Sequence, residues 1–87
     1  MSDPMIESLR RRIAGHDLAI LEAVNARLEL VAELREYKRA IEVEFVDPEQ
    51  EERLLGALEE ANGGPLSREG LRRLFREILA LTKDELG

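Results

Sequence analysis

The chain has 87 residues and a formal net charge of −6, contains no cysteine, and only 3% of its residues are aromatic. This length suits a single domain, residues 1–87. A negative charge with few aromatic rings disfavours nucleic acid as a partner, because phosphates need a basic face and bases need rings to stack on. Without cysteines, a signal peptide or a membrane-spanning stretch, the sequence predicts a cytoplasmic protein.

A long helix is the first predicted element, beginning near Asp3 and Pro4 and ending around residues 40–42. Asp is a favoured N-cap and Pro a favoured first helical residue. Apolar residues recur at helical spacings of three, four or seven: Ile6, Leu9, Ile13, Ile20, Val24, Val31 and Leu34. The segment from Leu9 to Lys38 is about 43 Å long at 1.5 Å per residue, whereas a globule of this size is roughly 30 Å across. The apolar stripe therefore predicts association with a second copy.

Two cations, Arg27 and Lys38, occupy places in this stripe where apolar residues are expected. They point within roughly 20° of each other at about 100° per residue, whereas Arg10 points about 100° away from Arg27. Burying an unpaired cation is unfavourable, so the stripe predicts an anion supplied by the fold, a partner or a ligand. The alternative is that both cations reach solvent or pair with carboxylates such as Glu29, Glu33 or Glu51.

A loop and a second helix follow. Residues 42–46 alternate like a strand but stand alone, so we expect an extended loop. Asp47 and Pro48 are favoured as N-cap and first helical residue, and Gln50 completes a variant of the capping box. This second helix is expected to end near Ala61.

The third helix follows a turn over residues 63–65, Gly-Gly-Pro, and has Ser67 as its predicted N-cap. The three arginines Arg72, Arg73 and Arg76 are expected to form a solvated face. The sequence thus predicts an all-α fold with one long helix and two medium helices.

Few residues of this sequence suggest a metal site or nucleophilic catalysis. His16 is the sole histidine and there is no cysteine, so neither a metal site nor a cofactor is expected. Asp17 beside it has no nucleophile at a suitable spacing. Asp47 and Glu51 are four residues apart and share one helical face. Capping alone explains Asp47, whereas Glu51 can either meet Lys38 or accept a hydrogen bond from a ligand hydroxyl.

In their order and spacing these residues resemble the all-helical AroQ-type chorismate mutase family, from about residue 6 to 86. The matching motifs are Leu9-Arg10, Ile13, Asp17, Arg27, Lys38, Val46-Asp47-Pro48, Glu51, Gly64-Pro65-Leu66 and Leu74 to Ile78. Each motif is weak by itself, but their order is specific. The resemblance implies an intertwined homodimer with two active sites, in which the long helix crosses the subunit boundary.

The resemblance also implies a role for each candidate residue. Arg10 is expected to reach the site of the other subunit, and Arg27 to bind a substrate carboxylate within its own chain. Lys38 is expected to hydrogen-bond the ether oxygen of the breaking C–O bond. Glu51 is expected to hold the ring hydroxyl, with Asp47 at the edge of the site.

At two positions the chain departs from the family's pattern. The family usually has Arg where this chain has Gln50. Its third helix brings Gln or Glu to the ether oxygen, where this chain has Leu86, with Glu85 one position earlier as the polar candidate. Thr82 fits the family's small hydroxyl residue.

The implied activity is that of an isomerase of aromatic amino acid biosynthesis, in the shikimate pathway, which rearranges chorismate to prephenate without metal or cofactor. One alternative is a related enzyme on the same fold, an isochorismate pyruvate lyase or an aminodeoxychorismate mutase. Another is a weakly active helical module that regulates or docks on a second shikimate-pathway enzyme. Glu51, suited to a ring hydroxyl, favours chorismate.

Overall fold

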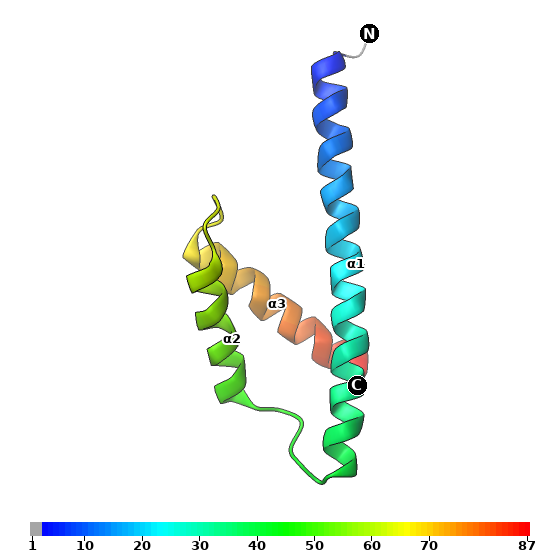
Figure 1. The fold of residues 1–87 in the computed structure, drawn as a ribbon, viewed down its shortest axis with the longest axis vertical. Coiled ribbons are helices and arrows are strands. Elements are labelled where there is room, and N and C mark those ends of the chain that lie inside the picture. Colours follow the sequence, from blue (N-terminus) through cyan, green and yellow to red (C-terminus); the bar gives the residue numbers. More distant parts are fainter. Residues whose placement is uncertain (1–2) are drawn as a thin grey trace. The chain divides into compact units, whose positions relative to one another are not determined.

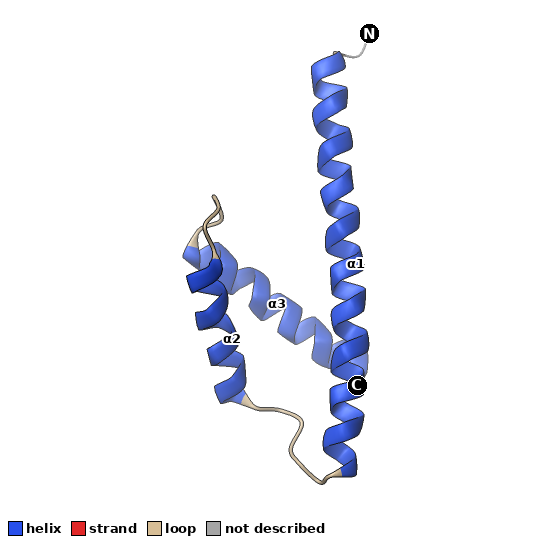
Figure 2. Ribbon diagram, in the orientation of Figure 1, coloured by secondary structure: helices blue, strands red, loops and turns tan. Residues whose placement is uncertain are grey.

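The computed structural model describes residues 3–87, which form three helices joined by two loops (Figures 1 and 2). The helices are α1, Pro4–Ala40, α2, Pro48–Ala61, and α3, Arg68–Leu86. Residues 3–87 contain no strand, which confirms the predicted all-α fold. The chain divides into two compact units, Met1–Leu34 and Arg35–Gly87, so that the last turns of α1 belong with α2 and α3.

The N-terminus of α1 is capped as predicted. The Asp3 carboxylate accepts hydrogen bonds from the backbone N–H groups of Met5 at 2.7 Å and Ile6 at 3.3 Å. These two donors have no partner inside the helix, and a capping side chain satisfies them. The helix then continues without interruption through Gly15 to Ala40.

At its C-terminus α1 closes through a left-handed residue, Glu42, with φ of 56°. The Glu42 N–H bonds to the Arg39 carbonyl at 3.2 Å, and the Val43 N–H to the Lys38 carbonyl at 2.8 Å. This pair of bonds is the Schellman arrangement, which satisfies the last helical carbonyls. The chain leaves it in the extended loop that the sequence predicted for residues 42–46.

The apolar stripe of α1 remains open in the single chain. None of the described side chains of α1 is buried, and Ile13 and Ile20 are 59% and 62% exposed. The prediction that this face is buried is therefore not met by the chain's own residues. None of the helices over residues 3–87 is both long and apolar enough to cross a membrane.

Helices α2 and α3 pack against each other with a small core. Leu55 of α2 and Leu71 of α3 are about nineteen-twentieths buried. Asp47 caps α2 by accepting from the Gln50 N–H at 3.1 Å, and Ser67 caps α3 by accepting from the Gly70 N–H at 2.9 Å. Both predicted helix starts are thus confirmed.

A cluster of ion pairs also joins α2 to α3. Arg72 binds Glu59 and donates to the Glu52 carboxylate at 2.9 Å, and Arg68 binds Glu59 as well. The Arg72 side chain is only 24% exposed. The prediction that Arg72 lies on a solvated face was therefore wrong, because its guanidinium meets carboxylates of the neighbouring helix.

We predict that Glu52 contributes to acid sensitivity. The hydrogen bond and positive charge of Arg72 hold the pKa of the Glu52 carboxyl below its ordinary value of 4.5. A group whose pKa is lower in the folded state stabilises the fold above its unfolded pKa, and this contribution disappears as the pH falls through the folded value. Glu52→Gln should therefore lose less stability than the native chain when urea unfolding at neutral pH is compared with unfolding below pH 4.5.

The matched control is Glu44→Gln, which neutralises an exposed carboxylate in the loop between α1 and α2. It should keep the acid sensitivity of the native chain. Equal acid sensitivity in Glu52→Gln and the native chain would contradict the assignment.

Candidate active site

Lys38 is held by the loop that follows it. Its side chain is half-buried in the last turn of α1, and Nζ donates to the carbonyl oxygen of Phe45 at 3.2 Å. The Lys38 carbonyl accepts from Val43, so both ends of the residue contact the same loop. An ammonium group carries three donors, so this contact leaves Nζ with further hydrogen bonds to give.

Arg35, one turn before Lys38, joins three segments of the unit Arg35–Gly87. Its guanidinium donates to the Leu86 carbonyl and, at 3.0 Å, to the Gly87 carbonyl. It also lies 5.6 Å from the centre of the Phe45 ring, within the range of a cation–π contact. Sequence reasoning missed this residue, although a cation three positions before Lys38 lies on the same helical face.

A cavity of 260 Å³ lies beside these contacts. It is lined by Arg35, Phe45, Val46, Lys83, Leu86 and Gly87. The lining combines two cations with apolar side chains, but Arg35 is bound by the two backbone carbonyls and Lys83 by the carboxylate of Glu51. This volume is close to the lower end of the range for small-molecule pockets, about 300 to 1,000 Å³.

Glu51 has a partner that the sequence did not indicate. Its carboxylate, in the first turn of α2, lies 3.1 Å from Nζ of Lys83 in α3. The side chain of Glu51 is 31% exposed. The suggested pairing of Glu51 with Lys38 is thus replaced by a contact with Lys83.

Asp47 and Gln50 are engaged at the start of α2. Asp47 caps the helix, while the side-chain oxygen of Gln50 accepts a hydrogen bond from Nε of Arg53 at 3.1 Å. The capping-box prediction was therefore correct for Asp47 but wrong for the Gln50 side chain, since its acceptor is used by Arg53. Gln50 itself is exposed.

Two candidates on α3 differ in environment. Thr82 is buried, and its hydroxyl donates to the Ile78 carbonyl one turn earlier at 2.6 Å. Glu85 is exposed in the last turn. The structure therefore buries Thr82 and leaves Glu85 at the surface.

Arg10 and Arg27 belong to the unit Met1–Leu34. Arg27 is half-buried and Arg10 exposed. Both lie on the uninterrupted helix α1, which also carries Lys38.

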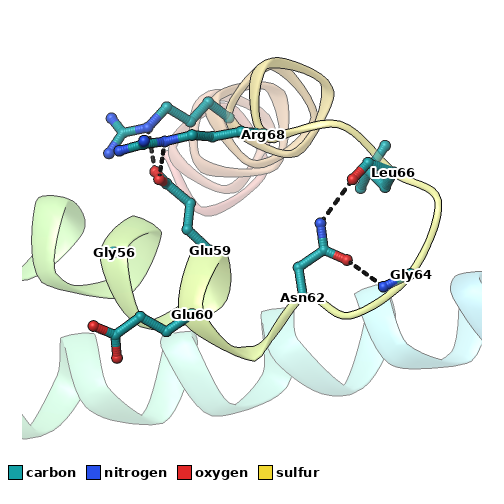
Figure 3. A pocket seen from close by; sticks show the side chains of 8 residues that line it. Gly56, Glu59, Glu60, Asn62, Gly64, Leu66 and Arg68 are labelled. Atoms are coloured by element: carbon teal, nitrogen blue, oxygen red, sulfur yellow. Dashed lines mark hydrogen bonds and ion pairs between the residues drawn. The ribbon is translucent and has the colours of Figure 1, made fainter.

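A larger cavity of 540 Å³ lies beside the turn between α2 and α3 (Figure 3). Asn62 closes this turn by donating to the Leu66 carbonyl at 2.8 Å and accepting from the Gly64 N–H at 3.1 Å. The Glu59 carboxylate in its wall is bound by Arg68 and Arg72. The predicted site residues do not line this cavity, and its ion pairs serve to join the two helices.

A family model and a known protein resemble this chain over most of its length. The family model for chorismate mutase type II matches residues 9–85. A bifunctional chorismate mutase/prephenate dehydratase from Stutzerimonas stutzeri is 36% identical over 80 residues, which cover 86% of this chain and 22% of that protein. The chain thus spans only about a fifth of the length of this relative.

Two solved structures of a chorismate mutase also resemble this chain. The form II structure of chorismate mutase from Thermus thermophilus superimposes with a TM-score of 0.88 at 31% identity, covering 92% of this chain and 91% of that chain. The form I structure of the same protein gives a TM-score of 0.87 at 31% identity, covering 90% and 98%. Both likenesses extend over nearly the whole of each chain.

We predict that Arg35→Met loosens the end of α3, because the carbonyls of Leu86 and Gly87 lose a charged donor. Hydrogen bonds to charged groups contribute about 1.5 to 3 kcal/mol, so amides in the last turn of α3 should exchange roughly tenfold faster or more. Hydrogen exchange followed by NMR measures this effect.

The control is Arg39→Met, in the same turn of α1, which removes an exposed ion pair with Glu36. Such pairs contribute little, so exchange in α3 should stay as in the native chain. Unchanged protection of the last turn of α3 in Arg35→Met would contradict the role given to Arg35.

Proposed function

Because this chain belongs to the chorismate mutase type II family, we propose that it catalyses the rearrangement of chorismate to prephenate. The observation that carries the proposal is the family match over residues 9–85, which includes every predicted site residue from Arg10 to Glu85. The likeness to two chorismate mutase structures over nine-tenths of the chain supports it. Location in the cytoplasm and a place in aromatic amino acid biosynthesis belong to the same proposal.

In this proposal the cations of α1 hold the two carboxylates and the ether oxygen of the substrate. Arg27 and the partner subunit's Arg10 bind the carboxylates, since a planar guanidinium fork matches a carboxylate with two parallel hydrogen bonds. Lys38 donates to the ether oxygen, where negative charge grows as the C–O bond breaks. The contact of Lys38 with Phe45 supports this role, because it fixes the ammonium while leaving donors for a ligand.

The remaining candidates surround the ring. Glu51 accepts a hydrogen bond from the ring hydroxyl, with Asp47 and Gln50 at the edge of the site and Thr82 and Glu85 on the side of α3. The reaction is a unimolecular rearrangement, so it requires neither a nucleophile nor proton transfer. Catalysis then consists of holding a flexible dianion in its reactive chair and stabilising the developing charge.

A homodimer completes the proposed site. Helix α1 spans about 55 Å at 1.5 Å per residue, and none of its described side chains is buried. A second copy on the apolar stripe would cover Leu9, Ile13 and Ile20, which are all at least 45% exposed. Burying such residues is the main source of dimer stability.

Another shikimate-pathway enzyme is a further partner in this proposal. The Stutzerimonas stutzeri relative is named as bifunctional, and this chain covers 22% of its length. An association of the two activities, covalent in that relative, supports a contact between this chain and a separate enzyme of the same pathway.

Loss of ultraviolet absorbance of chorismate measures the proposed activity. We predict that Lys38→Ala reduces turnover about a hundredfold or more, the effect of removing one donor aimed at developing charge. Arg27→Ala should reduce kcat/KM, because a substrate carboxylate loses its guanidinium partner. The control Arg39→Ala removes the exposed cation next to Lys38 and should retain native turnover. No turnover by the native chain, with helices and dimer intact, would instead favour a regulatory or docking module.

A subunit-mixing experiment tests the shared site. Arg10→Ala and Lys38→Ala chains should each be inactive alone. When both are unfolded and refolded together, mixed dimers contain one intact site and one doubly altered site. Random pairing then restores about a quarter of native activity. Recovery of no activity, with mixed dimers present, would show that Arg10 acts within its own chain.

A further inference from the structure

Lys83 on α3 contacts Glu51, a proposed substrate-binding residue, but is not itself among the proposed substrate-binding residues. Its Nζ lies 3.1 Å from Oε1 of Glu51, and its side chain is 46% exposed. Lys83 also lines the 260 Å³ cavity together with Arg35, Phe45 and Leu86. Lys83 therefore contacts Glu51 and also lines this cavity.

The position of this ion pair argues against a purely structural role. Arg68 and Arg72 already join α3 to the carboxylates of Glu52 and Glu59 on α2. The Lys83 pair links the first turn of α2 to the last turns of α3, at the end of the helix pair away from its connecting turn. A half-exposed pair of this kind adds little to stability.

Glu51 needs a counterion if it is to contact a dianionic ligand. A carboxylate repels the two negative charges of such a ligand unless a cation lies nearby. Its neighbour Gln50 is uncharged, and the side-chain oxygen of Gln50 is engaged by Arg53. Among the contacts that the structure gives Glu51, Lys83 provides the positive charge.

We propose that Lys83 is a positioning residue for the ring-hydroxyl subsite, an inference that rests on the proposed chorismate mutase activity. The ammonium holds Oε1 of Glu51 and offsets its charge. The second carboxylate oxygen, Oε2, then accepts the hydrogen bond from the ring hydroxyl. Lys83 thus acts on the substrate through Glu51.

Steady-state kinetics with chorismate test this role. Lys83→Met should lower kcat/KM about tenfold, within the range of coupling between residues in contact. The loss should appear mainly as a higher KM, because the hydroxyl contact is made in the ground state as well as in the transition state. Lys83→Arg keeps a cation there and should stay within about threefold of the native value.

A double-substitution cycle separates positioning from structure. In the Glu51→Gln background, Lys83→Met should change kcat/KM by less than about twofold, since its route to the substrate is already lost. The control Arg68→Met removes another ion pair between α2 and α3 and should keep native KM and kcat. Circular dichroism checks that each variant is folded.

The outcomes are distinct. A native KM in Lys83→Met, or an equal loss in the native and Glu51→Gln backgrounds, would overturn the role of Lys83 while leaving the activity in place. A KM increase in Arg68→Met as large as in Lys83→Met would also overturn it. Absence of turnover in the native chain would remove the proposed function and the Lys83 role together.

Discussion

The long helix α1 carries the cations Arg27 and Lys38 among its apolar residues, and no described side chain of this helix is buried within the single chain. Exposed apolar surface favours association, whereas a cation removed from water needs a compensating anion. In the proposed function a second copy covers the exposed apolar residues of α1, and a dianionic ligand binds the cations. The proposed dimer and the proposed reaction both depend on this combination.

Within the unit Arg35–Gly87, several contacts hold charged side chains in place. Lys38 is fixed by the Phe45 carbonyl, Glu51 by Lys83, and Arg35 contacts both Phe45 and the end of α3. Each of these contacts fixes a charged group before any ligand arrives. Catalysis by orientation requires such preorganisation, because charges that must first be rearranged stabilise a transition state less.

Helix boundaries were predictable from the sequence because capping is local. Asp3, Asp47 and Ser67 each bind backbone N–H groups two or three residues ahead, so the signal lies within one helical turn. The end of α1 at Ala40 was predicted, but the left-handed conformation of Glu42 was not, since Glu has no preference for it.

Side-chain partners were less predictable because they depend on how helices pack. The pairs of Lys83 with Glu51 and of Arg72 with Glu52 join residues that are far apart in sequence. The cations of α1 were recognised because a charge interrupts an apolar period, whereas Lys83 lies on α3 without such a contrast. Gln50 was misassigned because Arg53, one turn on, competes for its side chain.

A crystal structure with a dianionic analogue of the transition state would test the central claim most directly. The account predicts two chains in contact along α1, with the analogue held by Arg27 and Lys38 of one chain and by Arg10 of the partner subunit. An analogue bound in the cavity beside the turn between α2 and α3, or held by the residues of one chain alone, would contradict it.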